Sequence, residues 1–121
     1  MEIDELAQFI NASRVLDRTL NAILAEDGLR EDLWRIMHAL AQQPGMLMGE
    51  ISEKLTLPAA TTTRLVDQLA DNGLVFRRPA PEDGRKAAVH LSRTGHERLS
   101  RVASLISARS ASLKLPVLQR A

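Results

Sequence analysis

The sequence predicts a mainly helical α+β fold with one small β-hairpin. Two short helical stretches, residues 49–55 and 58–72, are separated only by Thr56 and Leu57, which is the spacing of a helix-turn-helix. Two strand-like stretches follow directly, and longer amphipathic helices flank the whole segment. The expected order is therefore four helices, a hairpin and a last helix, within a single domain of residues 1–121.

The first two helices are expected from their apolar periodicity. Over residues 3–25, apolar side chains recur every three or four positions, and an Asp-Gly pair ends the pattern. Residues 30–43 show the same spacing up to a Pro-Gly pair, which favours a turn. Both helices therefore have one apolar face to bury.

The later elements are marked by turn residues. Helix 58–72 starts with a proline, which suits a first helical turn, and ends at an Asn-Gly pair, which suits a left-handed stop. Strands are expected at 74–78 and 86–91, on both sides of a tip rich in proline, aspartate and glycine. The last helix is expected from residue 92 to about residue 113, with Gly95 in its first turn as an unfavourable helix residue.

Composition excludes several classes of function. The chain contains no cysteine, which rules out disulfides, cysteine-bound zinc and thiol catalysis. No apolar run approaches the roughly 20 residues of a membrane span, and the N-terminal segment is acidic where a signal peptide is basic. We therefore expect a cytoplasmic protein with no membrane partner.

Charge is distributed unevenly, although the net charge is only +1. Residues 1–57 carry ten acidic and five basic side chains (−5), whereas residues 58–121 carry five acidic and eleven basic side chains (+6). The C-terminal half, which contains the hairpin, is therefore the half that suits a polyanion.

A helix-turn-helix followed directly by a hairpin is typical of a winged helix-turn-helix, whose second helix enters the DNA major groove. At the start of helix 58–72, small residues allow close approach, threonines can contact phosphates or thymine methyl groups, and an arginine can reach guanine or phosphate. Three consecutive threonines would be unfavourable on an ordinary exposed helix face. The candidate DNA-contacting residues are Ala59, Ala60, Thr61, Thr62, Thr63 and Arg64, with Thr61, Thr62 and Arg64 as the expected base contacts.

The hairpin, residues 75–91, is the expected wing. It concentrates four cations, namely Arg77, Arg78, Arg85 and Lys86. Arg85 is the candidate for minor-groove insertion, because narrow A·T tracts attract guanidinium groups. Asp83 is unsuited to a phosphate, so we interpret it as a brace that pairs with Arg77 or Arg85; a plain turn-forming aspartate is the alternative.

Several spaced motifs together resemble the multiple antibiotic resistance regulator (MarR) family. They are residues 57–69, Asn72-Gly73-Leu74-Val75, Pro81-Glu82-Asp83-Gly84-Arg85 and Leu91-Ser92-Arg93-Thr94-Gly95. The resemblance covers roughly residues 29–102 and departs from the family at Pro58 and Ala60, where members often carry serine. It implies a sequence-specific regulator of double-stranded DNA, with no cofactor and no enzymatic activity. Family members are mostly repressors that release DNA when a small, often aromatic, effector binds.

The resemblance also implies a homodimer on a pseudo-palindromic operator, with half-sites about one DNA turn apart, roughly 34 Å. Residues 3–25 and 95–115 would form the dimerisation helices, and packing within one subunit is the alternative for their apolar faces. The candidate dimerisation residues are Leu6, Ile10, Leu16, Leu20, Leu99, Val102 and Ile106. The chain stops soon after Pro116, where the family continues into a further helix, so the dimer relies on these two helices or the chain is truncated.

Three other functions compete with DNA binding. An enzyme is disfavoured because the sequence contains no metalloprotease, nucleophile-elbow, P-loop or dinucleotide motif. A metal-responsive regulator would use His38, His90 or His96, but these are spread along the chain and no metal site is expected. A winged-helix module that binds protein is the strongest alternative, and the arginines retained at positions 64, 77 and 85 argue against it.

Overall fold

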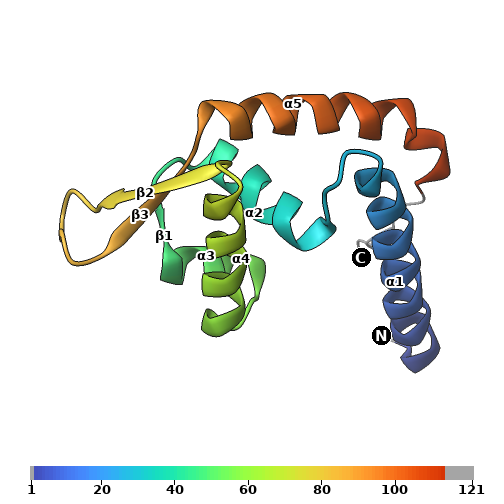
Figure 1. Ribbon diagram of the computed structural model, residues 1–121. Helices are drawn as coiled ribbons and strands as arrows, with labels where there is room; N and C mark the ends of the chain where they lie inside the picture. The colour runs from blue at the N-terminus through green and yellow to red at the C-terminus, as the bar shows by residue number, and fades with distance from the viewer. Residues whose placement is uncertain (1, 114–121) are drawn as a thin grey trace. The chain divides into compact units, whose positions relative to one another are not determined.

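The computed structural model describes residues 2–113 (Figure 1). The chain divides into two compact units, one of the residues up to Glu31 together with those from Val102 on, the other of Asp32–Arg101. The second unit extends beyond the expected winged segment, residues 30–91, as far as Arg101. The single domain over residues 1–121 stays a prediction, and Pro116 lies outside the described residues.

We call the second unit, Asp32–Arg101, the winged unit. It is built on three helices, α2 (Glu31–Gln42), α3 (Met48–Leu55) and α4 (Ala59–Asp71), and also contains the start of a later helix. Their bounds lie within one residue of those expected, because turn residues end each apolar pattern. Each helix turns one apolar stripe inward, so that α2 buries Ile36, Met37 and Leu40, α3 buries Ile51 and Leu55, and α4 buries Leu65, Val66 and Leu69. Burial of these stripes, at roughly 25 cal/mol per Å² of apolar surface, holds the helix-turn-helix together.

The wing belongs to a three-stranded antiparallel sheet of order β1-β3-β2, formed by β1 (Met46–Leu47), β2 (Val75–Pro79) and β3 (Ala87–Leu91). β2 and β3 form the expected hairpin, whereas the two-residue strand β1 was not predicted. β1 pairs Met46 with Val89 and Leu47 with Ala88. β3 is therefore the central strand, which explains why neighbouring Ala88 and Val89 are both buried.

Two glycines support the junctions around the sheet. Gly73 follows α4 with φ +70°, the left-handed conformation expected at a helix end. Gly95 lies in the first turn of α5 (Arg93–Ala108), where it was expected as an unfavourable helix residue. A Cβ on Gly95 would lie 2.1 Å from the Leu74 carbonyl oxygen, so the close approach of α5 to that carbonyl requires glycine. Ser92 begins α5 by accepting a hydrogen bond from the Gly95 N–H at its Oγ, 3.0 Å away.

The other unit contains α1 (Ile3–Ala25), the end of α5 and the short 3₁₀-helix η1 (Ser110–Ser112). α5 ends five residues before the expected position. Immediately beyond it, Arg109 donates to both carboxylate oxygens of Glu26, at 2.9 and 3.3 Å. The hydrogen bond from Arg109 is the main cause that lowers the pKa of the Glu26 carboxyl.

The residues expected to form the dimer interface differ in exposure. Leu6 and Ile10 of α1 are 42% and 48% exposed, and Leu16, Leu20, Leu99 and Ile106 are half-buried. Val102 is fully buried within the chain, so the expectation that it contacts a partner is wrong. Ile3, Phe9 and Val15 also leave apolar surface exposed on α1.

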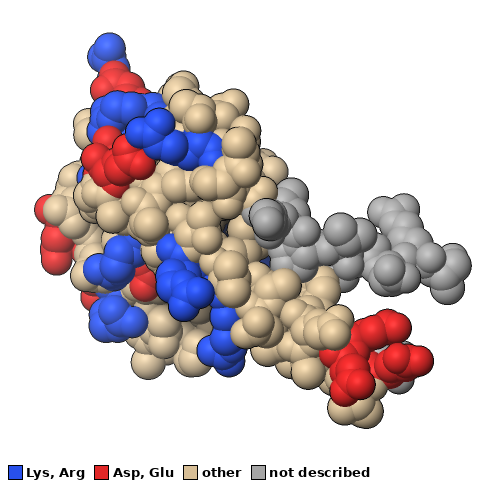
Figure 2. All heavy atoms as spheres, turned by 90° about the vertical axis from the view of Figure 1, so that its right-hand side faces the viewer, with Lys and Arg blue, Asp and Glu red and all other residues tan. Residues whose placement is uncertain are grey.

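The first turn of α1 is acidic. It carries Asp4 and Glu5, and Figure 2 shows acidic side chains gathered at the lower end of the face that it draws. Negative charge near a helix N-terminus interacts favourably with the helix dipole.

Within residues 2–113, no helix has the length and apolar character that a bilayer crossing requires.

Candidate nucleic-acid interface

The start of α4 is exposed and has little side-chain bulk. Pro58 precedes the helix with φ −59° and ψ 147°, and its side chain provides no cap. The structure leaves Ala59, Ala60, Thr63 and Arg64 exposed and Thr61 half-buried. This end of the helix therefore offers methyl groups, threonine hydroxyls and one guanidinium, the side-chain groups that can contact base edges in a major groove.

Thr62 corrects the sequence interpretation, because its side chain is only 1% exposed. Its hydroxyl accepts a hydrogen bond from Ser52 Oγ at 2.7 Å and donates one to the Pro58 carbonyl oxygen at 3.2 Å. The expected base contact by Thr62 is therefore wrong. In the helical repeat, Thr62 falls on the same face as Leu65, Val66 and Leu69, so this residue ties α4 to α3.

Arg77 has a partner that sequence reasoning missed. Its guanidinium donates to the carboxylate of Asp67 on α4, so strand β2 of the wing is joined to the candidate recognition helix. Asp67 lies on the exposed flank of α4 between buried positions. The sequence did offer one signal for this pair. An exposed acidic residue on α4 is followed shortly afterwards by the cationic strand β2.

The wing tip is a tight hydrogen-bonded turn. Ala80 N–H donates to the Lys86 carbonyl at 2.9 Å, Asp83 N–H to the Ala80 carbonyl at 3.2 Å, and Lys86 N–H to the Asp83 carbonyl at 3.0 Å. Arg85 and Lys86 are exposed at this tip. The tip therefore presents two cations on an ordered backbone.

Asp83 contacts Arg85 in two ways. Its Oδ1 accepts from both the backbone N–H and the Nε of Arg85, each at 3.1 Å. These bonds, the side-chain bond first, lower the pKa of the Asp83 carboxyl. Of the two arginines considered as partners, the structure pairs Asp83 with Arg85, and the same carboxylate also closes the turn. The Arg85 side chain nevertheless remains 92% exposed.

Arg78 lies against an aromatic pair on the outer face of the sheet. Its guanidinium carbon is 5.0 Å from the centroid of the Phe76 ring, a cation–π distance. Phe76 and His90 face each other across β2 and β3 and stack with centroids 5.3 Å apart. Arg78 is thus the wing cation with an aromatic contact, and it points along a different face from its neighbour Arg77.

The candidate site contains cations, hydroxyl groups and methyl groups, and no arrangement suited to a metal. Among residues 2–113, no group of three histidine or acidic side chains could hold a metal ion. His38 and His96 are exposed, and His90, on β3 of the wing, is half-buried.

The model of the MarR family matches residues 33–86, the segment that contains α3, α4 and most of the wing. Residues 33–86 are a MarR-family domain. Members of this family are non-enzymatic, which agrees with the absence of a catalytic motif in the sequence.

Curated relatives of this MarR-family domain are named as transcriptional repressors. IacR of Pseudomonas putida is 27% identical over 85 residues, which cover 70% of this chain and 51% of that protein. YetL of Bacillus subtilis strain 168 is 32% identical over 89 residues, 72% of this chain and 53% of that protein. The chain spans about half the length of the curated relatives it matches.

Solved structures of MarR-family proteins share the fold. A point mutant of MarR from E. coli in complex with operator DNA has a TM-score of 0.83 at 20% identity, covering 93% of this chain and 84% of that one. CouR, a transcriptional repressor bound to a 23-mer DNA duplex, has a TM-score of 0.80 at 21% identity, covering 93% and 82%. The winged helix-turn-helix architecture expected from the sequence is therefore confirmed.

Proposed function

We propose that this chain is a sequence-specific, double-stranded DNA-binding transcriptional repressor. The observation that carries the proposal is the joint exposure, within one winged unit, of the start of α4 and of Arg85 on the wing tip. The sequence relatives named as repressors support it. A protein that acts on chromosomal DNA would work in the cytoplasm of a bacterium.

The start of α4 is the proposed base-contacting surface. Ala59 and Ala60 allow the helix to approach the base edges, and Arg64 can donate two hydrogen bonds to a guanine. Thr61 and Thr63 can donate to phosphates or pack on thymine methyl groups. Sequence preference would then depend mainly on Arg64 and the two threonines.

The wing is the proposed source of sequence-independent affinity. Arg85 and Lys86 are exposed at its tip, and Arg85 is suited to a narrow minor groove. The carboxylate of Asp83 holds the Arg85 side chain near the turn, so part of the ordering cost is met before DNA binds. Arg77 and Arg78 lie further back, each with a contact inside the winged unit.

We extend the proposal to a homodimer on a pseudo-palindromic operator, which the MarR family supports. The exposed apolar residues of α1 are the proposed contact surface, since Leu6, Ile10 and Phe9 would otherwise remain in water. Release from DNA by a small aromatic effector is part of the same proposal. With two winged units, half-sites would lie about one DNA turn apart, roughly 34 Å.

A salt titration of duplex binding tests this function. Affinity should fall by roughly 0.9 log units per log unit of salt for each phosphate neutralised. A module that binds only protein would show no such dependence on any duplex, and genomic selection of bound fragments would return no shared operator. Binding that is absent, or insensitive to salt, would therefore reject the proposal.

A further inference from the structure

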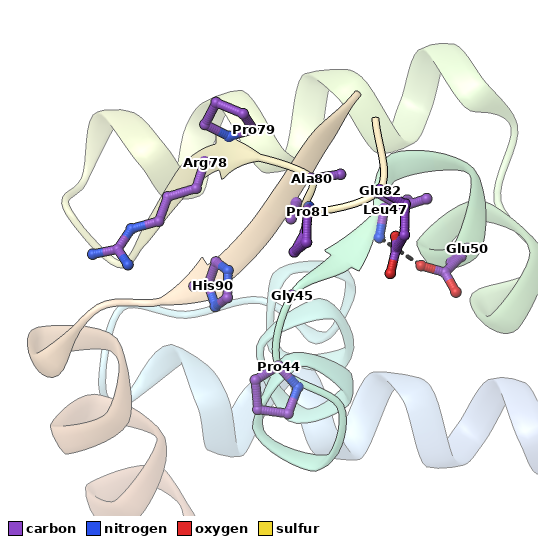
Figure 3. Close-up of a pocket in the computed structure, with 11 residues that line it drawn as sticks. Pro44, Gly45, Leu47, Glu50, Arg78, Pro79, Ala80, Pro81, Glu82 and His90 are labelled. Atoms are coloured by element: carbon purple, nitrogen blue, oxygen red, sulfur yellow. Dashed lines mark hydrogen bonds between the residues drawn. The ribbon is translucent and has the colours of Figure 1, made fainter. Parts of the chain in front are cut away.

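The outer face of the sheet bears a cavity of about 550 Å³. Its walls come from the turn after α2, from β1 with the start of α3, from β2 with the first residues of the wing tip, and from β3 (Figure 3). All of these segments belong to the winged unit. The volume lies within the range of roughly 300–1,000 Å³ that is typical of small-molecule sites.

Flat groups form part of the cavity wall. Pro81 lies above it and Pro44 below it in Figure 3, with the imidazole of His90 at one end. The imidazole is stacked on Phe76 at an interplanar angle of 14°. A Cβ on Gly45 would approach the His90 ring to 3.1 Å, so glycine leaves room for the ring there. These walls suit a planar ligand, because the proline rings are rigid and the imidazole is held by its stacking on Phe76.

The two ends of the cavity differ in charge. Glu50 and Glu82 lie at the end near α3, whereas Arg78 lies at the opposite end, beyond His90 (Figure 3). Glu50 is held in place because its Oε1 accepts the Leu47 N–H at 2.8 Å. The guanidinium of Arg78 is already engaged with the Phe76 ring. The carboxylate end is therefore the one that attracts a cation, whereas the guanidinium of Arg78 repels a cation from the opposite end.

We propose that this cavity binds a small organic cation that carries a planar ring, such as a benzylic amine, which is protonated at neutral pH. Its ammonium group would lie toward Glu50 and Glu82, and its ring would lie among Pro44, Pro81 and His90. Two carboxylates near one cavity end favour a cation over an anion by Coulomb attraction. The prolines and the imidazole favour a ring over a strongly hydrated inorganic cation.

Occupancy would also alter the wing tip, and this consequence rests on the proposed DNA-binding function. Ala80 and Pro81 line the cavity, and Ala80 is hydrogen-bonded directly to Lys86 across the tip. A ligand that touches this segment and α3 together would fix the tip relative to the helix-turn-helix. DNA affinity would then respond to the amine.

Three probes of similar size test the site without DNA. Benzylammonium, benzyl alcohol and benzoate have the same ring and differ in charge, so titration of each into the full chain, followed by ¹⁵N chemical shifts, isolates the contribution of charge. Benzylammonium should bind most tightly, benzyl alcohol more weakly and benzoate weakest, with shifts centred on Gly45, Leu47 and Ala88. Tighter binding of benzoate, or shifts centred outside the winged unit, would overturn the proposal.

A double variant and a matched control test whether the carboxylates at the cavity end attract the ammonium group. Glu50→Gln keeps an oxygen that can accept the Leu47 N–H, and combined with Glu82→Gln it should weaken benzylammonium binding by about five- to tenfold, with benzyl alcohol unchanged. Glu53→Gln is the matched control, because Glu53 is an exposed residue of α3 that does not line the cavity. Equal benzylammonium affinity in the double variant and the control would overturn the proposal, and thermal melts of both would verify that they are folded.

A separate mobility-shift series tests the regulatory consequence. Benzylammonium should change operator affinity in the wild type and in Glu53→Gln, but not in the double variant. If the amine binds without changing operator affinity, the cavity assignment stands and the link to the wing fails. If no duplex binds at all, the proposed function fails while the amine titrations remain interpretable.

Discussion

The start of α4 and the tip of the wing are both exposed, but different forces hold them in place. The helix end is positioned from behind by packing, with Thr62 and Leu65 buried beneath its exposed face. The wing tip has little core and is held by hydrogen bonds, of which those between Asp83 and Arg85 are accessible to water. The start of α4 therefore has a fixed shape and one charged side chain. The wing tip instead carries charged side chains whose positions can adjust.

This difference assigns distinct tasks to the two surfaces. Discrimination between bases needs donors held in a fixed geometry, which a packed helix provides. Attraction to phosphates needs charge and tolerates adjustment, which an exposed arginine provides. We therefore expect substitutions in α4 to alter sequence preference and substitutions in the wing to alter affinity for all sequences.

Arg85→Ala should cause the largest loss. A charged donor of this kind contributes about 1.5–3 kcal/mol, so affinity should fall roughly 10- to 150-fold on operator and non-operator DNA alike, and the salt slope should decrease by about 0.9. Mobility shifts at several salt concentrations measure both quantities. Arg93→Ala is the control, because its side chain is 93% exposed and paired with Glu97 but lies outside the wing. Equal losses in the two variants would contradict the wing assignment.

Arg64→Ala should relax preference at one base pair of each half-site. A bidentate contact discriminates by about 1–3 kcal/mol, so the affinity ratio between the preferred and a substituted base pair should fall roughly 5- to 150-fold. Binding to a library of randomised operators measures this ratio at every position. A uniform loss at all positions, with preferences intact, would mean that Arg64 contacts phosphate only.

Thr62→Val should reduce stability instead of DNA preference. It removes a hydroxyl that bonds Ser52 and Pro58, so the free energy of unfolding should fall by about 1–2 kcal/mol. Thr63→Val is the control, since Thr63 makes a similar bond to the Ala59 carbonyl at 3.1 Å but is exposed. Chemical denaturation should show a change within about 0.5 kcal/mol for the control. A stable Thr62→Val protein with altered operator preference would restore Thr62 as a base contact.

The smallest effect concerns pH at the wing tip. Hydrogen bonds from Arg85 lower the folded-state pKa of Asp83 below the ordinary value of 3.8. The bond is therefore fully present above the unfolded pKa and is lost as pH falls through the folded pKa. Carboxyl ¹³C shifts, followed by acid titration, should place the Asp83 midpoint below 3.8, and Arg85→Ala should move it back toward that value. A midpoint that does not respond to Arg85→Ala would show that the pair is absent in solution.

The sequence was sufficient for the helices and the hairpin, because local signals determine them. Apolar periodicity and turn residues placed the bounds of α1 through α4 within one residue. β1 could not be predicted, because two residues have no periodicity and only pairing with Val89 and Ala88 makes them a strand. The early end of α5 was not predicted either, and the side-chain bond of Arg109 just beyond it joins residues 83 positions apart in the chain, which no local pattern reveals.

The sequence predicted which types of residue form the candidate site. It was less able to predict in which direction each side chain points. A run of three threonines indicates a helix surface, but only the packing of α3 on α4 determines that the middle one points inward. The Asp83–Arg85 pair is local and was anticipated as one of two pairings. The Asp67–Arg77 pair depends on how β2 passes α4, and no periodic pattern contains that information.

The pairing of β3 has a mechanical consequence. At its root the wing is bonded on both sides of β3, to Met46 and Leu47 on one edge and to β2 on the other. Beyond the pair formed by Pro79 and Ala87, only the bonds of the turn remain. The base of the wing is therefore held by strand pairing on two sides, whereas its tip is held only by the hydrogen bonds of the turn and can bend more easily. A slip of one residue along β3 would turn Val89 outward, so the wing cannot slide, and it can adjust to the curvature of a groove only by flexing near its tip.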